Sequence, residues 1–319
     1  LRPAPPSPLA LDPQRKALDH LLERIGRNLP LWHSSPEGFD RDSGKVNLRL
    51  WPRQHAPETL PGVFLHLYHA DLAPVFAEHL RQMPCDYRLY VSTDTAPKAE
   101  EISAALPQAA IRVLDNRGRD IWPKLYGFRD AHARHDIVLH LHGKKSLHSG
   151  KLDEWLDHIL TSLMGSQGEM ARILSFFDSI PRLGMVMPGV FRNVLSAAHW
   201  GANHDIAREL ALRLGLRAPL PQDNALRFPV GSMFWARRAA LQPLLDLDLR
   251  PEHFPPEAGQ VDGTLAHAIE RMLGVTCRAG GYHLLPVLGA ESRLHQRFQK
   301  QARSNGELRK ALESGAFDG

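Results

Sequence analysis

The strongest constraint on the fold is a regular alternation of apolar and amphipathic segments that begins at Pro61. The apolar segments span 62–69, 87–94, 110–116 and 136–143, and the amphipathic segments between them span 71–84, 96–107 and 120–135. Strands that alternate with helices of about ten to fifteen residues form parallel sheets, because each helix carries the chain back to the edge where the strand began. We therefore predict an α/β fold with a mostly parallel, Rossmann-type central sheet flanked by helices.

The chain after His148 is predicted to be mostly helical. Helical periodicity is found in 151–165, 166–181, 204–216 and 261–273, apolar strand-like segments at 183–189 and 227–241, and a polar segment at 191–205. We predict one main domain at 61–289. A linker and N-terminal helical segment at 1–60 precede it, and a C-terminal helical tail at 290–319 follows it.

The composition bounds the classes of function. The 319 residues are 43% hydrophobic, which suffices for a sizeable core. A net charge of +4 allows local basic surfaces for an anionic ligand but is far weaker than the charge of a nucleic-acid-binding protein, so we expect no nucleic-acid partner. Cys85 and Cys277 are too few for a disulfide framework or a thiolate zinc site, and they fit a reducing compartment.

The location is predicted from what the sequence lacks. No window approaches the roughly 18 consecutive apolar residues that cross a bilayer, and the Pro-rich segment 1–12 has no hydrophobic export core. We therefore expect a cytoplasmic protein. Because the first residue is not Met, we also expect a piece of a larger multi-domain polypeptide, with 1–12 as linker.

Polar residues gather where the predicted parallel strands end, which is where α/β sheets bind ligands. The segments concerned are 92–94, 115–120 and 140–146. We expect Asp94 and Asp120 to contact a ligand. The loop before the third helix opens with backbone amides that could receive an anion, with Gly118 allowing close approach, and its members are Asn116, Arg117, Gly118 and Arg119. The arginines could instead be surface charges.

The stretch HLHGKKS at 140–146 allows three interpretations. His140 and His142 share one face of a strand, so they could bind zinc with His148 or Asp120 as a third ligand. They could also be buried, hydrogen-bonded histidines. In the interpretation that we favour, a cationic wall neutralises a diphosphate without a metal. Its members are His140, His142, Lys144 and Lys145.

Three downstream segments add candidates. Gly231 and Ser232 lie in an aromatic-rich predicted strand, where glycine indicates close approach by a ligand or another backbone, although a plain core strand is the alternative. Trp200 and Asn203 combine a ring with an amide, as sugar sites do, although a simple loop fits as well. Asp262 is either a helix N-cap or a carboxylate that accepts a proton from a hydroxyl nucleophile.

An ordered set of motifs resembles the rhamnan synthesis protein F family over residues 61–285. The motifs are NRGRDIWP (116–123), HLHGKKS followed by a helix with Trp155, MVMPG (185–189), WGAN (200–203), FPVGSMFWAR (228–237) and GQVDGTLAHAIER (259–271). This resemblance implies bacterial cell-surface polysaccharide assembly, a GT-A-like fold, and a glycosyltransferase that moves a sugar, such as rhamnose or another deoxyhexose, from a nucleotide-diphosphate donor. It also implies a lipid-linked or growing glycan acceptor at the inner face of the cytoplasmic membrane.

The resemblance further implies roles for individual residues. A GT-A enzyme typically carries Asp-x-Asp at the end of the fourth strand to hold a divalent cation, whereas this chain has His140-Leu141-His142 at that place. We therefore expect no cofactor and a transferase that needs no metal at this place. Asp262 matches the position of the acidic base of inverting enzymes. The alternatives are a zinc-dependent hydrolase that uses His140 and His142, and a glycan-binding module without catalysis.

Overall fold

A computed structural model describes residues 60–143, 153–216, 218–257, 259, 261–288 and 305–314. It also describes a two-stranded antiparallel pair formed by Phe39–Asp40 (β1) and Lys45–Val46 (β2). All of these residues belong to one compact unit, 34–319. The predicted N-terminal helix lies outside the described residues.

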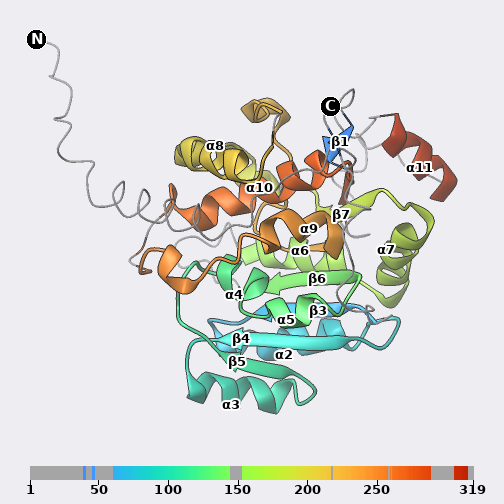
Figure 1. The fold of residues 1–319 in the computed structure, drawn as a ribbon. Helices are drawn as coiled ribbons and strands as arrows, with labels where there is room; N and C mark the ends of the chain where they lie inside the picture. Colours follow the sequence, from blue (N-terminus) through green and yellow to red (C-terminus); the bar gives the residue numbers. More distant parts are fainter. Residues whose placement is uncertain are drawn as a thin grey trace, which may run out of the picture. The chain divides into compact units, whose positions relative to one another are not determined.

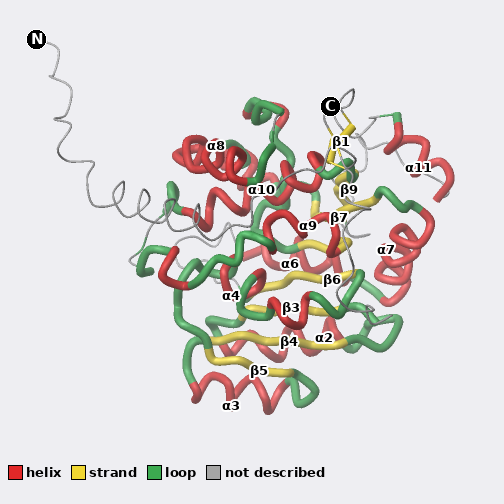
Figure 2. The backbone as a smooth tube through the Cα atoms, viewed as in Figure 1, coloured by secondary structure: helices red, strands yellow, loops and turns green. Residues whose placement is uncertain are grey.

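The central sheet of the described chain has seven strands in the order β5-β4-β3-β6-β8-β7-β9 (Figure 1). Their bounds are Gly62–His66 (β3), Arg88–Thr93 (β4), Ala110–Val113 (β5), Ile137–His142 (β6), Leu183–Pro188 (β7), Phe234–Arg237 (β8) and His283–Val287 (β9). The strand β8 is antiparallel to both of its neighbours, and the other strand pairings of this sheet are parallel. The predicted α/β fold with a mostly parallel sheet flanked by helices is confirmed, and Figure 2 shows the alternation along the chain.

Two sets of helices cover the sheet. The set that shares a core with one face comprises Ala73–Leu80 (α2), Ala96–Ala105 (α3), Asp153–Met164 (α6) and Gln167–Ser179 (α7), and Asn305–Glu313 (α11) packs against α7. The other set comprises Ile121–Leu125 (α4), Arg129–His132 (α5), Arg238–Leu245 (α9) and Leu265–Ala279 (α10), with His204–Arg213 (α8) against α10. None of the described helices combines the length and the apolar character that crossing a bilayer requires.

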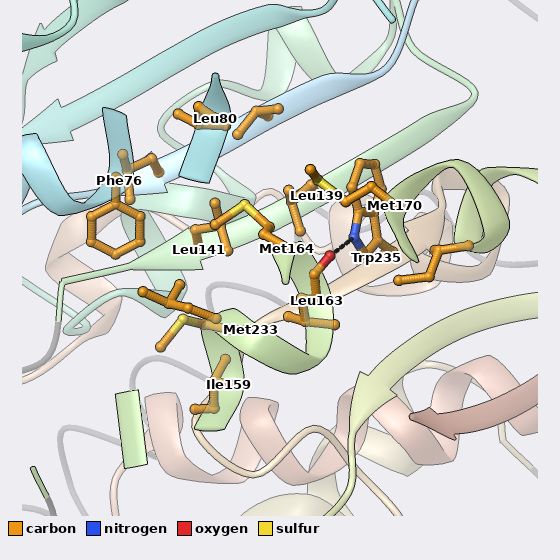
Figure 3. Packing of buried hydrophobic residues seen from close by; sticks show 14 of the residues in the cluster. Phe76, Leu80, Leu139, Leu141, Ile159, Leu163, Met164, Met170, Met233 and Trp235 are labelled. Carbon is orange, nitrogen blue, oxygen red and sulfur yellow. Dashed lines mark hydrogen bonds between the residues drawn. The ribbon is translucent and has the colours of Figure 1, made fainter. Parts of the chain in front are cut away.

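The first face of the sheet is mostly apolar. Alternate side chains of the strands, such as Leu139 and Leu141, pack against α2, α6 and α7 (Figure 3). Trp235 on β8 is fully buried there, and its indole N–H donates to the carbonyl oxygen of Leu163 at 3.1 Å. Full burial of each large apolar side chain stabilises the fold by about 1.5 to 3 kcal/mol, so this face anchors the sheet.

The opposite face carries aromatic and polar side chains in two rows across the strands. The strand register aligns Tyr90, Phe64, His140 and Phe234 in one row, and Ser92, His66 and His142 in the row nearer the carboxyl ends. Phe64 stacks on His132 of α5 with a centroid distance of 3.9 Å, which fixes α5 over this face. The second row therefore lies where the parallel strands end and α4 begins.

The structure differs from the prediction in two predicted elements and in one strand that the sequence did not predict. The predicted helix 120–135 is divided into α4, which ends at Leu125, and α5, which begins at Arg129. Gly127 lies between them, where an added Cβ would lie 2.6 Å from the carbonyl oxygen of Pro123. Gly231 and Ser232 precede β8 in a turn and are not inside a strand. The strand β9 was not predicted, since it contains Pro286, which an edge strand tolerates. The boundaries at 60 and 289 stay predictions.

Candidate functional site

The topology singles out one place for a ligand. From β3 the chain adds β4 and then β5 on one side, whereas β6 joins β3 on the other side. Open α/β sheets bind ligands outside the carboxyl ends of the strands at such a switch point. The side chains of His66 on β3 and His142 on β6 are neighbours in register there, and the turn of α4 that starts at Asp120 lies beside them.

Asp120 is the centre of a cluster of charged and polar groups. Its Oδ2 atom lies 2.8 Å from the Nζ of Lys124, which is four residues along the same short helix, and 4.0 Å from the Nε2 of His142. The hydroxyl of Ser232 donates a hydrogen bond to the same oxygen. The side chain of Asp120 is 14% exposed and that of Lys124 only 1%. The cluster thus places a carboxylate at the solvent boundary above a buried lysine.

The surroundings of Asp120 favour its ionised form. Burial by itself raises the pKa of Asp120, but the electrostatic influence of His142 and Lys124 and the hydrogen bonds from Lys124 and Ser232 outweigh burial, so the pKa lies well below its ordinary value. Burial lowers the pKa of Lys124, and Asp120 and Glu270 oppose that effect. At neutral pH we therefore treat Asp120 and Lys124 as an ion pair.

The turn formed by Gly231 and Ser232 is held from several elements. Both residues have positive φ, 91° and 51°. The Gly231 amide donates to Glu270 on α10 at 2.7 Å, and its carbonyl oxygen lies 2.8 Å from the Nε2 of His142. The Ser232 carbonyl oxygen accepts from Lys124 at 2.5 Å. The predicted donor contact through Gly231 and Ser232 is not available in this arrangement, because their polar groups are used inside the protein.

The loop that opens α4 uses its amides in the same way. The Arg117 amide donates to the carbonyl oxygen of Asp115 at 2.8 Å, and the Arg119 amide to a carboxylate oxygen of Glu257 at 3.0 Å. The guanidinium of Arg117 donates to the carbonyl oxygen of Phe254 at 3.0 Å. The amides of Arg117 and Arg119 are therefore occupied within the protein, and the predicted anion site in this loop stays a prediction.

The remaining members of this loop have separate roles. Gly118 has φ +65°, and an added Cβ would lie 2.8 Å from the ring of Phe254, so close packing between loops explains this glycine. Asn116 and Arg119 are exposed. Of the loop residues predicted to bind the donor, these two side chains reach solvent.

His140 lies in the core. It is fully buried, its ring stacks on Phe234 at a centroid distance of 4.9 Å, and it lies 5.0 Å from the ring of His132. Burial lowers the pKa of His140 well below its ordinary value. Aromatic rings enclose His140, so the described contacts do not support its place in a diphosphate wall, which stays a prediction.

Several residues that were predicted to bind a metal ion or a diphosphate lie outside the described part of the chain. Lys144, Lys145 and His148 lie outside the described residues. Among the described residues, no group of three histidine, cysteine or acidic side chains is arranged to hold a metal. Neither the zinc interpretation of the two histidines nor the lysine interpretation therefore gains a geometric argument from the described part of the chain.

Asp94 directly follows β4 and lies beside Lys98. The two side chains form an ion pair at 2.6 Å, and the ammonium of Lys98 also lies 3.9 Å from the ring centroid of Tyr68. Tyr68 is 40% exposed and follows β3. This arrangement puts an aromatic ring, a carboxylate and an ammonium at the carboxyl ends of β3 and β4.

Asp262 joins two segments of the second half. Its Oδ2 accepts from the Ala202 amide at 3.0 Å, and its Oδ1 accepts from the side-chain amide of Asn203 at 2.6 Å. The guanidinium of Arg271 on α10 lies 3.7 Å away. Burial raises the pKa of Asp262, but these hydrogen bonds and Arg271 lower it overall. The N-cap position of α10 is Thr264, so the N-cap interpretation of Asp262 is wrong.

Trp200 and Asn203 are structural in this conformation. Trp200 is 4% exposed, and its indole N–H donates to the carbonyl oxygen of Pro221 at 2.8 Å. Asn203 is fully buried, and its amide nitrogen donates to the Trp200 carbonyl oxygen as well as to Asp262. Neither side chain presents a surface to a sugar, so the predicted acceptor contacts would require this loop to rearrange.

Several residues around Asp120 and Asp262 were not predicted from the sequence. They are His66, Lys124, His267, Glu270 and Arg271. Lys124 had a signal, because a lysine in the apolar turn IWPKL lies four residues after an aspartate, the spacing at which two side chains of a helix meet. The α10 residues had none, since only the fold brings α10 beside α4.

Comparison with known proteins connects this arrangement to a family. Over 231 residues the chain is 35% identical to the uncharacterized protein WxcX from two strains of Xanthomonas campestris pv. campestris, B100 and ATCC 33913. This match covers 70% of the chain and 32% of the relative, so the chain spans about a third of the length of these relatives. A structure of CMP:2-keto-3-deoxy-manno-octonic acid synthetase complexed with CTP matches 75% of the chain and 97% of its own, at 12% identity and a TM-score of 0.38, which is too low to support an argument.

The family model for rhamnan synthesis protein F matches residues 49–282. This span contains the sheet from β3 to β8 and the Asp120 cluster. Its bounds also agree with the segment in which the ordered motifs occur. The chain therefore belongs to the rhamnan synthesis protein F family.

Proposed function

We propose that this chain is a GT-A-like glycosyltransferase domain. It transfers a sugar, such as rhamnose or another deoxyhexose, from a nucleotide-diphosphate sugar to a growing bacterial cell-surface polysaccharide. The observation that carries the proposal is the Asp120 cluster at the switch point between β3 and β6, the place where open α/β sheets bind nucleotides. Membership of a family named for rhamnan synthesis supports the same class of substrate.

The donor would lie across the carboxyl ends of β3, β4 and β6. In our proposal Asp120 contacts a sugar or ribose hydroxyl, and Asp94 with its neighbours contacts the nucleotide. Arg119 has a side chain that is 43% exposed, and its guanidinium is a cation beside the proposed donor site. Lys144 and Lys145 follow β6 in the sequence after Gly143, and we assign them to the diphosphate on that ground. Cations placed in this way would stabilise the leaving diphosphate.

Asp262 is our proposed proton acceptor for the acceptor hydroxyl. Its side chain is 34% exposed, and its lowered pKa keeps it ionised at neutral pH. A base with a low pKa accepts a proton weakly, so the step would need the hydroxyl to become more acidic as the bond to the anomeric carbon forms. The acceptor would be a lipid-linked or growing glycan, reached from the cytoplasmic face of the membrane by peripheral association.

One observation favours a second candidate, a module that binds nucleotide sugar or glycan without transferring it. Both carboxylate oxygens of Asp262 accept internal hydrogen bonds, from Ala202 and Asn203, which is the pattern of a structural carboxylate. Binding and transfer separate the candidates. A module would bind ligand and show no product, whereas a transferase would release nucleoside diphosphate in the presence of acceptor.

A thermal-shift screen across nucleotide-diphosphate sugars, with and without manganese, tests the proposal. A ligand that binds only the folded state adds about 2.7 kcal/mol to the free energy of unfolding at a hundredfold excess over Kd. The midpoint of thermal unfolding rises as a result. We expect one nucleotide sugar to stabilise the protein and Asp120→Asn to reduce that shift. If no nucleotide sugar stabilises the protein under either condition, the glycosyltransferase proposal fails. A shift that needs manganese would contradict the metal-independent part of it.

A further inference from the structure

Lys124 is a buried lysine whose hydrogen-bonding groups are all engaged within the protein. Lysine is rarely buried without a partner, and here the side chain is 1% exposed. The ammonium group lies 2.8 Å from Asp120 Oδ2, 2.5 Å from the Ser232 carbonyl oxygen and 3.3 Å from the Ser232 hydroxyl. An ammonium group has three protons, and three acceptors surround it. Lys124 therefore has no proton left with which to bind a phosphate.

The two oxygens of the Asp120 carboxylate differ. Oδ2 is the atom that faces Lys124, the Ser232 hydroxyl and His142. Oδ1 has no hydrogen bond or ion pair with the described residues. It is also not one of the fully buried polar atoms that lack a hydrogen-bond partner. The side chain is 14% exposed, and Oδ1 is the oxygen that the described residues leave for a ligand.

We propose that Lys124 is a positioning residue that holds the Asp120 carboxylate so that Oδ1 accepts a hydrogen bond from a ligand hydroxyl. The proposal rests on the proposed function, and it names the chemistry of that site. A carboxylate oxygen accepts hydrogen bonds and repels phosphate, so the ligand group must be a neutral donor. In a nucleotide sugar this donor is a hydroxyl of either the transferred sugar or the ribose.

The neighbouring groups keep the negative charge on Asp120 near neutral pH. The ionisable side chains that face the pair, from β3, β6 and α10, are His66, His140, His142, Glu270 and His267. Burial lowers the pKa values of His66 and His267 to about 4 and that of His140 well below its ordinary value. His142, whose Nε2 lies 4.0 Å from Asp120 Oδ2, and Lys124 at 2.8 Å are the two groups whose charge most lowers the pKa of Asp120.

Removal of the Lys124 ammonium has a predictable consequence. Burial alone raises the pKa of Asp120, and Lys124 is among the groups that outweigh it. In Lys124→Met the carboxylate should take up a proton at a higher pH. The protonated acid no longer offers the same acceptor, so ligand affinity should fall as the pH decreases, by about tenfold for each pH unit below the new pKa.

The first test needs no ligand. Aspartate carboxyl carbons labelled with ¹³C are titrated by NMR between about pH 4 and 8, the range above the ordinary aspartate pKa. The Asp120 resonance is assigned by its loss in Asp120→Asn. We expect no titration of Asp120 in the wild-type protein and a clear titration in Lys124→Met. The same titration curve in both proteins would overturn the proposal.

The second test separates the sources of the hydroxyl. Calorimetry with a nucleotide sugar and with the corresponding nucleoside diphosphate compares wild-type protein, Asp120→Asn and Lys124→Met. We expect Asp120→Asn to weaken binding roughly ten- to a hundredfold. Loss with the nucleotide sugar alone identifies a hydroxyl of the transferred sugar, and loss with both ligands identifies the ribose. Unchanged affinity for both ligands overturns the proposal.

Two further variants serve as a control and as a substitute for Lys124→Met in these measurements. Arg309→Met removes the cation of an exposed pair with the same spacing, Arg309 and Glu313 at 2.9 Å, and should change neither measurement. If Lys124→Met does not fold, Ser232→Ala removes one donor to Asp120 Oδ2 and should shift the titration in the same direction by less; no shift would overturn the proposal. If the wild-type protein binds no nucleotide sugar, the glycosyltransferase proposal fails, while the NMR titration still decides the role of Lys124.

Discussion

The Nζ of Lys124 lies 2.8 Å from a carboxylate oxygen of Asp120 and is 1% exposed. The pair connects α4 to the turn before β8, because the same ammonium donates to the carbonyl oxygen of Ser232. An ion pair at this depth orders the end of the sheet where a ligand would bind. The pKa of Asp120 therefore depends on the charges of its neighbours.

Loss of Lys124 alone should destabilise the fold more than loss of both charges. An unpaired buried charge costs about 3 to 5 kcal/mol, whereas replacement of both partners is tolerated better. We expect Lys124→Met to lower the free energy of unfolding by that amount, and the double variant Asp120→Asn with Lys124→Met to recover part of the loss. Urea denaturation measures both. A single variant that is as stable as the wild-type protein would contradict the assigned ion pair.

Acid should destabilise the protein below the ordinary pKa of histidine. Burial lowers the pKa values of His66 and His267 to about 4 and of His132 to about 3. The unfolded chain therefore binds protons first as the pH falls below about 6.5, so the stability present above that pH is lost between about pH 6.5 and 4. The slope should be about 1.4 kcal/mol per pH unit for each such group.

Urea titrations at several pH values would measure this slope. His132→Phe keeps a ring against Phe64 and removes one titrating group, so it should flatten the dependence by about one such step. A free energy of unfolding that does not change between about pH 6.5 and 4 would contradict the assigned burial of these histidines.

Two glycines with the same backbone conformation should respond differently to alanine. Gly118 and Gly215 both have φ +65°, but an added Cβ at Gly118 would lie 2.7 Å from the Cβ of Trp122 and 2.8 Å from the ring of Phe254, whereas Gly215 faces open space. Gly215→Ala should cost about 1 to 2 kcal/mol from backbone strain alone. Gly118→Ala should cost clearly more in urea denaturation. Equal costs would show that the loops at Gly118 pack less tightly than described.

Asp262→Asn should separate binding from transfer. The substituted side chain keeps its size and loses its charge, so we expect nucleotide-sugar binding to be retained and the rate of transfer to fall by about a hundredfold or more. An assay of released nucleoside diphosphate measures the rate. Asp130→Asn, on the exposed pair with Arg112 at 2.9 Å, is the matched control and should leave transfer unchanged. An unchanged rate in Asp262→Asn would remove Asp262 from the reaction.

The strand and helix pattern could be predicted because burial on both faces leaves a direct trace in the sequence. Each of β3 and β6 is a nearly continuous apolar run, and the helices between them follow their own period. The strand β9 left a weaker trace, since it includes Pro286 and lies at the edge of the sheet. Its existence depends on pairing with β7, which is about a hundred residues earlier in the chain.

The position of Asp120 near the strand ends could be predicted, whereas the contacts of individual side chains could not. Asp120 was expected at a strand end because parallel strands bring such residues to one edge. Which side chains point outward could not be derived in the same way. His140 and His142 look equivalent in the sequence, yet one is enclosed by Phe64 and Phe234 and the other hydrogen-bonds to Gly231. That difference arises from residues far away in the chain that cover the sheet.

The most direct test of the proposed function is isothermal calorimetry of nucleotide-diphosphate sugars against the wild-type protein and Asp120→Asn. The account predicts that one nucleotide sugar binds the wild-type protein and that Asp120→Asn binds it roughly ten- to a hundredfold more weakly. Absence of binding by any nucleotide sugar to the wild-type protein would contradict the account.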